Sequence, residues 1–423
     1  MATDTKTTPL NTWHRDNGAN MADFGGYDMP LWYSSVKDEH LIVLTGAGVF
    51  DTSHMAAVTV AGPGAADLLQ QCFTNNLDAC VGPAAKPLST GRCVYGAFLD
   101  DKGHTIDDAI VFYIAKERYF VVVNAGMGGA IAGHLEKNRG NRDAAIIDLS
   151  DRLGKMDIQG PAAAKILRKA LADPAAVFAG MPYFSFSGHY DPASPLADAV
   201  RLEDGTPILL SRTGYTGEFG FEIFLAPDKI QNLWERLLEA GKDYGIKPCG
   251  LAARDSLRAG AVLPLSHPDI GHWPFINHPW PFALPFTADQ TGFTKDFIGR
   301  SALENPDEVF FTQAFVGKDL RKITAGEDST VIDADGREIG TVLTCATDMG
   351  VGRHQGAIVS VASPDRPEGF KARGLCCGFI KVDRKLPLGE HVDLADSRRT
   401  ITVTITEDVR PDRTARKPMK EMV

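Results

Sequence analysis

The chain contains 423 residues, of which 44% are hydrophobic and 23% charged, and its formal net charge is -10. At about 150 residues per domain this length predicts two to three domains, and the composition excludes wholesale disorder. A net acidic chain has no global electrostatic reason to bind nucleic acid or an anionic membrane. No run approaches the roughly 20 apolar residues that span a bilayer. The sequence therefore predicts no nucleic-acid partner and no membrane partner.

The cysteines and the N-terminal segment bear on the compartment. The 7 cysteines are odd in number and scattered, and no Cys-x-x-Cys pair occurs. This pattern fits a reducing compartment better than a disulfide framework or a zinc ribbon. Residues 1–18 are polar and lack the apolar core of a signal peptide. We therefore expect a cytoplasmic protein.

Three segments share one pattern, in which alternating apolar residues change to a helical period after a turn that contains proline. They are residues 57–72, 155–170 and, more loosely, 220–240. We expect each to form a strand followed by a helix, with one apolar stripe from Ile230 to Leu238 in the third. Such units predict α+β domains whose sheets are covered on one face, and whether they form a true repeat stays open.

Residues 92–124 predict three consecutive strands joined by two tight turns. The first turn, at 100–103, contains the Asp and Gly residues typical of hairpins. If Asp101 and Lys102 form the loop, Tyr95 lies directly opposite Asp108. A one-residue bulge would change that register.

Asp107 and Asp108 interrupt the second of these strands. Adjacent residues of a strand point to opposite faces, so Asp108 shares its face with Ile110 and Phe112. A carboxylate among apolar neighbours is costly unless it is paired or has a chemical role. The alternative is a strand that begins later, with both aspartates in the turn.

Segment 211–222 is rich in glycine and runs into an apolar strand, but it lacks the Gly-Lys-Ser/Thr of a phosphate-binding loop. Its glycines would let a flat ligand approach the backbone. Glu222 could accept two parallel N–H bonds from a heterocycle, or it could be an edge residue of a hairpin. Arg254 lies in a predicted helix with Arg258 four residues later, a spacing that usually marks a solvated face.

The remaining chain divides into an irregular part and a β-rich part. Residues 264–286 are too rich in proline for regular structure and predict a linker or lid. Its histidines His267, His272 and His278 match no common zinc spacing, so we predict no metal site. The last hundred or so residues predict a small β barrel or sandwich. The basic tail at 410–419 is either a solvated end or a clamp for an anionic group.

Several segments together resemble the aminomethyltransferase (T-protein) family of the glycine cleavage system, whose members are tetrahydrofolate-dependent one-carbon transferases. The matching segments are 21–33, 45–55, 73–76, 106–112, 211–222, 248–258 and 296–303. Their order and spacing run through most of the first 300 residues, whereas the C-terminal part matches only in outline.

The resemblance implies an α+β fold. Three domains form a cloverleaf around a central funnel for tetrahydrofolate, namely two α/β sheet domains and a C-terminal β-barrel-like domain. Residues 1–300 would then form the folate-binding region, with two interleaved α+β domains, and residues 301–423 the C-terminal β-rich domain. It further implies that Asp108 is the catalytic aspartate, next to N5 of the folate. The other folate-binding residues that it implies are Tyr95, Tyr215, Glu222, Arg254 and Met55.

The sequence departs from the family on the side that faces the one-carbon donor. Gly260 replaces an acidic residue, and an aromatic insert at 272–286 follows. A preserved folate side with a changed donor side leaves two donors open: a lipoylated carrier protein, or a small N-, O- or S-methyl compound that a demethylase would use. The aromatic residues of the insert could enclose a methylated cation, could pack as a lid, or could form a subunit contact. They are Trp273, Phe275, Trp280 and Phe282. A non-catalytic iron–sulfur assembly factor is disfavoured, because its Lys-Gly-Cys-Tyr-x-Gly-Gln motif is missing.

Overall fold

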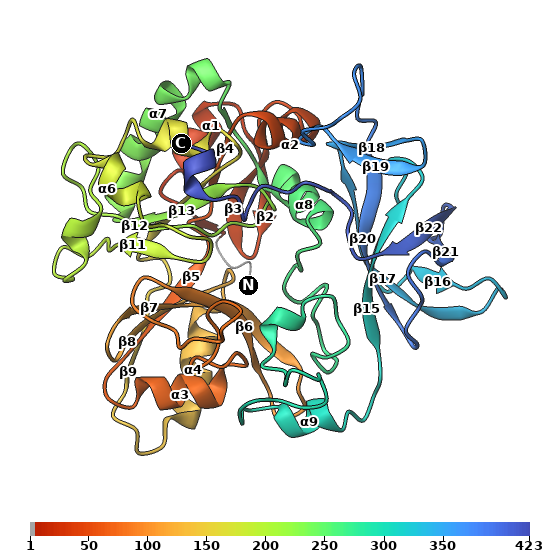
Figure 1. The fold of residues 1–423 in the computed structure, drawn as a ribbon, viewed down its shortest axis with the longest axis horizontal. Helices are drawn as coiled ribbons and strands as arrows, with labels where there is room; N and C mark the ends of the chain where they lie inside the picture. The colour runs from red at the N-terminus through yellow and green to blue at the C-terminus, as the bar shows by residue number, and fades with distance from the viewer. Residues whose placement is uncertain (1–4) are drawn as a thin grey trace.

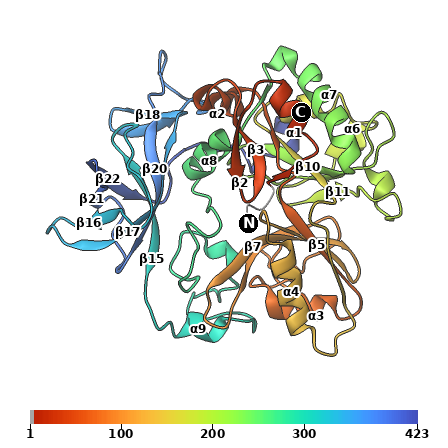
Figure 2. The same cartoon turned by 180° about the vertical axis from the view of Figure 1, so that it is seen from behind.

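The computed structural model describes residues 5–423. Residues 1–4 lie outside the described part; they are the first residues of the polar N-terminal segment and of the predicted 1–300 region. Three lobes lie around a common centre, each built on its own sheet (Figures 1 and 2). No helix within residues 5–423 is both long and apolar enough to cross a membrane.

The first lobe is a five-stranded sheet in the order β6-β7-β8-β5-β9, covered on one face by two helices. The strands are β5 (Ala56–Ala61), β6 (Cys93–Leu99), β7 (Thr105–Ala115), β8 (Arg118–Val123) and β9 (Ala145–Asp148), and the helices are α3 (Ala65–Cys72) and α4 (Gly128–Arg139). The period-2 pattern of 92–124 therefore gives the three predicted strands. Because β7 begins at Thr105, both Asp107 and Asp108 lie in the strand, and the alternative of a turn is wrong.

The second lobe is a six-stranded sheet in the order β11-β12-β13-β10-β4-β14. Its strands are β4 (Gly48–Asp51), β10 (Gly154–Gln159), β11 (Phe186–Gly188), β12 (Leu209–Ser211), β13 (Gly220–Leu225) and β14 (Lys247–Pro248). Its helices are α5 (Ala163–Leu167), α6 (Pro174–Phe178) and α7 (Ile230–Ala240), and the predicted stripe on α7 is buried against the sheet. In the sequence, β4 of the second lobe precedes the strands of the first lobe and β10 follows them, so the two lobes are interleaved.

An N-terminal hairpin and two short helices adjoin the second lobe. These are β1 (Lys6–Thr7), α1 (Asn11–Asp16), β2 (Asn20–Phe24), β3 (Tyr27–Trp32) and α2 (Val36–Thr45). Helix α8 (Leu251–Gly260) contacts both β3 and the third lobe. From 261 to 299 the chain is irregular apart from one short 3-10 turn at Pro281–Ala283, as the prolines predict, and it leads into α9 (Arg300–Glu304).

The third lobe is a closed barrel in the order β15-β20-β17-β16-β21-β22, with an attached hairpin of β18 and β19. Its strands are β15 (Phe311–Gly317), β16 (Thr330–Ile332), β17 (Glu338–Asp348), β18 (Val351–His354), β19 (Ala357–Ser360), β20 (Leu375–Val382), β21 (His391–Ala395) and β22 (Thr400–Thr406). Two sheet lobes with helices and a C-terminal barrel confirm the predicted fold class.

The register of the β6–β7 hairpin differs from the prediction. Tyr95 lies opposite Ile110 rather than Asp108. The loop has one residue more than expected, because the Asp100 N–H donates to the His104 carbonyl at 2.9 Å, and a bulge follows between Phe98 and Leu99. Two one-residue shifts restore the original face, since side chains alternate with period two. Tyr95 and Asp108 therefore still share a face, as diagonal neighbours.

The first two sheets face one another through an aromatic contact. The Phe112 and Phe224 ring centroids are 6.0 Å apart, and those of Phe120 and Phe224 are 5.4 Å apart. Alternation along β7 places Asp108 on the same face as Phe112, and alternation along β13 places Glu222 on the same face as Phe224. Both carboxylates therefore project from the faces that the two sheets turn toward each other.

Candidate functional site

The first wall of the candidate site is a hydrogen-bonded pair of carboxylates on β7. The Tyr95 hydroxyl donates to Asp108 Oδ2 at 2.9 Å, and Asn124 Nδ2 donates to Asp108 Oδ1 at 2.8 Å. The same Nδ2 donates to Asp107 Oδ1 at 2.8 Å, and the Asn124 N–H donates to Asp107 Oδ2 at 2.9 Å. Asp107 is fully buried whereas Asp108 is half-buried. Asp108 is thus oriented on both oxygens and still accessible.

Two members of this wall were missed in the sequence. Asn124 follows directly after the buried strand β8, and a polar residue at that point could have indicated a contact with the neighbouring strand. Ser266, which donates to Asp107 Oδ1 at 2.9 Å, lies 159 residues away in the irregular segment. No local pattern marks Ser266, because only the tertiary fold brings it to β7.

Burial and the nearby charge of Asp108 raise the pKa values of Asp107 and Tyr95. Burial, followed by the nearby charge of Asp108, raises the pKa of Asp107 to about 7. Burial and then Asp108 also raise the pKa of Tyr95 well above its ordinary value. Tyr95 therefore stays a neutral donor at neutral pH, and Asp107 keeps its proton in mildly acidic solution.

The raised pKa of Asp107 predicts a dependence of stability on pH. The folded state keeps the Asp107 proton up to about pH 7, whereas the unfolded chain loses it near its ordinary pKa of 3.8. The stability due to this group is therefore fully present below the ordinary pKa and is lost as pH rises toward 7. Asp107→Asn should remove this loss, so that the free energy of unfolding of the variant rises relative to wild type between pH 4 and pH 7. Urea titrations of both proteins across this range would measure it, and parallel pH profiles would contradict it.

The second wall is a row of buried charges from the facing sheet and helix α8. Lys155 Nζ lies 2.5 Å from Glu222 Oε1 and 3.1 Å from Asp157 Oδ1, and Arg254 Nη1 lies 2.5 Å from Asp157 Oδ2. Asp157 is directly opposite Glu222 in the β10–β13 pair. The row alternates in sign, which compensates for the desolvation of each charge.

Two of the alternatives drawn from the sequence are wrong here. Glu222 is not an edge residue, since β13 pairs with β10 on one side and β12 on the other. Arg254 does not lie on a solvated helix face, because it is buried against Asp157. A spacing of four residues between two arginines cannot distinguish a solvated face from a face that meets buried carboxylates.

Tyr215 and Met55 lie beside these walls. The Tyr215 hydroxyl donates to the Pro264 carbonyl, and the Arg254 guanidinium lies 5.2 Å from the centre of the Tyr215 ring. The pKa of Tyr215 lies above its ordinary value, mainly because of burial, and the charge of Asp108 contributes to the rise. Met55 is half-buried against the aromatic cluster between the sheets. The structure thus brings the segment that carries Tyr215 near the first wall.

The aromatic insert does not form one wall. Phe275 and Trp280 are buried, and Trp280 packs on Phe379 of the barrel at 5.1 Å between ring centroids, as a lid would. Trp273 lies under Lys381 Nζ, 4.8 Å from its ring centre. Phe282 alone keeps 52% of its surface exposed, and its ring lies 5.7 Å from that of Tyr95. One exposed aromatic face therefore adjoins the residue that bonds Asp108.

The histidines of the same segment do not assemble. His267 and His272 are exposed, and the nearby Asp269 is buried in an ion pair with Arg258. Among residues 5–423 no group of three or more His, Cys, Asp or Glu side chains is arranged to hold a metal ion.

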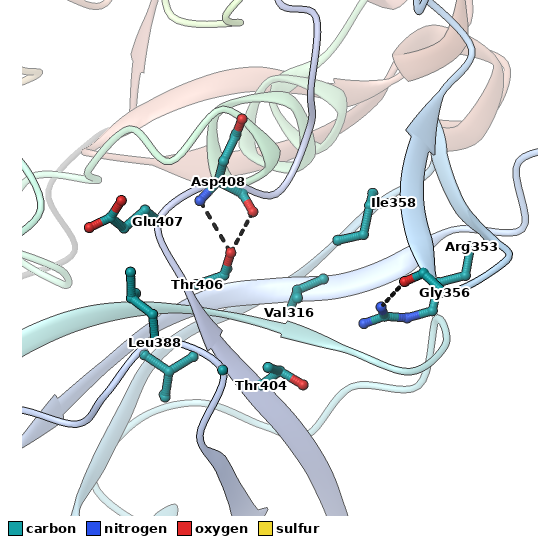
Figure 3. A pocket seen from close by; sticks show the side chains of 11 residues that line it. Val316, Arg353, Gly356, Ile358, Leu388, Thr404, Thr406, Glu407 and Asp408 are labelled. Atoms are coloured by element: carbon teal, nitrogen blue, oxygen red, sulfur yellow. Dashed lines mark hydrogen bonds between the residues drawn. The ribbon is translucent and has the colours of Figure 1, made fainter.

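A groove of about 450 Å³ on the barrel lies apart from these walls (Figure 3). It is lined by residues of the barrel and its hairpin, and the Thr406 hydroxyl within it donates to the Asp408 carbonyl at 2.7 Å. None of the residues predicted to bind folate lines this groove.

Comparison with known proteins gives consistent matches. The family model described as the GCVT N-terminal domain matches residues 10–273. The aminomethyltransferase of Streptomyces avermitilis is 37% identical over 360 residues, covering 82% of this chain and 87% of that protein. The aminomethyltransferase of Symbiobacterium thermophilum is 36% identical over 342 residues, covering 80% and 85%. The crystal structure of glycine cleavage system aminomethyltransferase T from Bartonella henselae has a TM-score of 0.71 at 26% identity, covering 99% of both chains.

Proposed function

This chain belongs to the aminomethyltransferase family and is an enzyme, a tetrahydrofolate-dependent one-carbon transferase; from this premise we propose that it carries a one-carbon unit from a donor to N5 of tetrahydrofolate, with Asp108 as the catalytic group. The observation that carries the proposal is the oriented, accessible carboxylate of Asp108, held by Tyr95 and Asn124 opposite the charged wall of the second lobe. Residues 1–300 form the folate-binding region in this proposal, and residues 301–423 the C-terminal domain.

The residues present fit a reduced pterin. Glu222 has one oxygen bonded to Lys155 and the other to Thr213, which leaves a lone pair on each oxygen. Two such lone pairs suit two parallel N–H donors of a heterocycle. Tyr215 and Met55 offer flat and apolar surface beside it, and Arg254 keeps the charged row neutral. Tyr95, Tyr215, Glu222, Arg254 and Met55 are therefore the proposed folate-binding residues.

Asp108 has the position and the partners of a general base. When bound, tetrahydrofolate supplies the nucleophilic nitrogen that accepts the one-carbon unit. Asp108 takes the proton that this nitrogen loses and stabilises positive charge that develops near the transferred carbon. Tyr95 and Asn124 keep the carboxylate in one orientation, so little reorganisation is needed. Holding donor and acceptor together is worth about 7–11 kcal/mol of the activation barrier when alignment is good.

The favoured donor is an aminomethyl group on a lipoylated carrier protein, in keeping with the names of the relatives. Demethylation of a small methyl compound is a second candidate, favoured by the exposed ring of Phe282 beside Tyr95, since an aromatic face near a carboxylate attracts a methylated cation. Mass spectrometry of the folate product decides between them. Methylenetetrahydrofolate and ammonia formed only with the carrier, whose thiol is released as the carbon–sulfur bond breaks, support the first donor. Methyltetrahydrofolate and the demethylated compound formed without a carrier support the second.

The proposed compartment is the cytoplasm. All 7 cysteines are free thiols in the described part of the chain, and five of them are buried. Buried thiols that have formed no disulfide are typical of proteins in reducing compartments.

Glu222→Gln should weaken the binding of tetrahydrofolate by about tenfold or more. The change keeps the shape of the side chain but replaces a charged acceptor, and bonds to charged groups contribute about 1.5–3 kcal/mol. Calorimetric titration under anaerobic conditions would measure the dissociation constant. Glu239→Gln is the matched control, because Glu239 is exposed on α7 of the same lobe. Equal affinity of the Glu222→Gln variant and wild type would remove Glu222 from the site.

A further inference from the structure

The C-terminal segment is not the solvated end that one interpretation of the sequence predicted. Residues 408–417, here called the C-terminal strap, leave the barrel after β22, pass α8 and reach the second lobe, where the chain ends near α1 and α7 (Figure 1). Arg410 is fully buried, so the strap is not a solvated end. Its guanidinium binds carboxylates of this same chain, so the anionic groups that it clamps are internal.

The strap is hydrogen-bonded along the glycine-rich segment that carries Tyr215. The Phe219 N–H donates to Thr414 Oγ1 at 2.9 Å, and the Ala415 N–H donates to the Gly217 carbonyl at 3.1 Å. Arg410 donates to the Thr216 carbonyl. At the start of the segment, Arg212 Nη2 donates to the Ala415 carbonyl at 3.1 Å. Both ends of the segment are therefore tied to the strap, and Thr213 and Tyr215 lie between these ties.

Arg410 joins this segment to two other parts of the molecule. Its Nη1 lies 2.6 Å from Asp348 Oδ2 at the end of β17, and its Nε lies 3.2 Å from Glu218 Oε1. Its Nη2 also donates to the Leu257 carbonyl of α8 at 3.2 Å. Asp348 in turn bonds His40 Nε2 of α2 at 2.9 Å. A single buried guanidinium thus links the barrel, α8 and the glycine-rich segment.

Gly260 provides the space for this link. A Cβ atom at position 260 would lie 1.8 Å from Asp348 Oδ2 and 2.9 Å from Arg410 Nη1. No side chain fits there without displacing the ion pair. Gly260, which stands in place of an acidic residue, therefore leaves room for a carboxylate from the barrel, that of Asp348.

We infer that the C-terminal strap positions the folate-binding segment, with Arg410 as the positioning residue through which the barrel fixes Tyr215 and, by way of Thr213, Glu222. The inference rests on the proposed function, because it assigns the strap a role in binding folate. The Thr213 hydroxyl donates to Glu222, so the position of the segment also orients that carboxylate. Pre-ordering the segment reduces the conformational entropy that binding would otherwise cost.

The test compares tetrahydrofolate affinity with stability in four variants. Arg410→Met should weaken binding by about tenfold, and Arg410→Lys, which keeps the charge, should recover part of the loss. Thr414→Val removes only the two bonds of one hydroxyl and should weaken binding by about threefold. The control is Asp333→Asn, which breaks the contacts of the buried Asp333 carboxylate to the exposed side chains of Arg337 and Arg384 within the barrel and touches no residue of 211–220. It should lower the melting temperature and leave the affinity within about twofold of wild type.

The outcomes separate the two proposals when all titrations are made well below the melting temperature of each variant. If wild type fails to bind tetrahydrofolate, the proposed function is refuted, whereas equal affinity of Glu222→Gln and wild type removes Glu222 from the site and refutes the part of the positioning role that runs through Thr213. If Glu222→Gln weakens binding but Thr414→Val and both Arg410 variants bind as wild type does, only the positioning role is refuted. Should Arg410→Met not fold, Arg410→Lys and Thr414→Val decide the question on their own.

Discussion

Replacing Asp108 by asparagine is expected to leave the fold intact and to lower turnover by about 10²- to 10⁴-fold, the usual contribution of a general acid or base. Asparagine has nearly the same shape, and its carbonyl can still accept from Tyr95 or Asn124. Its amide cannot take a proton, and it cannot compensate positive charge at the transferred carbon. Formation of the folate product, followed by mass spectrometry with whichever of the two candidate donors supports turnover, measures the loss.

Asp101→Asn is the matched control for this variant. Asp101 lies in the turn of the same hairpin and is exposed, so the same chemical change there should leave turnover unaltered. Circular dichroism and the melting temperature of both variants should match those of wild type. Wild-type turnover of a folded Asp108→Asn variant would refute the catalytic assignment.

Short-range patterns predicted the strands well, because period-two burial is a property of the local sequence. The alternation over 92–124 gives β6, β7 and β8, and it places Asp108 on the face of Phe112. The exact register was not predictable, because a longer loop and a bulge both depend on how the hairpin packs. Each of them shifts the register by one residue, and two such shifts return a side chain to its original face. The prediction that Tyr95 and Asp108 share a face was therefore confirmed, although the predicted pairing was wrong.

The charged members of the site were visible as exceptions within apolar runs, whereas their partners were not. Asp107 and Glu222 each interrupt an apolar strand, and both are buried. Ser266 and the strap contact the site across more than a hundred residues of chain, as the bonds from Ser266 to Asp107 and from Arg212 to Ala415 show. Contacts at such separations leave no periodic trace, so the role of the tail stayed open until the fold was known.

The second large effect concerns the row of charges behind Glu222. Asp157 is its central carboxylate, fully buried between Lys155 and Arg254. Burial alone would raise the pKa of Asp157, but the charges of Arg254 and Lys155 outweigh it and hold the pKa below its ordinary value. The stability that Asp157 contributes is therefore present above its ordinary pKa and is lost as pH falls through the lower folded pKa.

Asp157→Asn should cost about 3–5 kcal/mol of stability at pH 7, because it leaves Arg254 buried without its partner. The melting temperature should fall by roughly 3–6 °C for a chain of 423 residues. A double variant that also carries Arg254→Met removes the stranded cation, so its loss should be clearly smaller than the sum of the two single losses. Additive losses in this cycle, measured by denaturant unfolding, would show that the two groups do not interact. Because Lys155 bridges Asp157 and Glu222, the single variant leaves the Lys155 charge paired with Glu222 alone and should also weaken tetrahydrofolate binding. Arg254→Met should affect binding less than Glu222→Gln does.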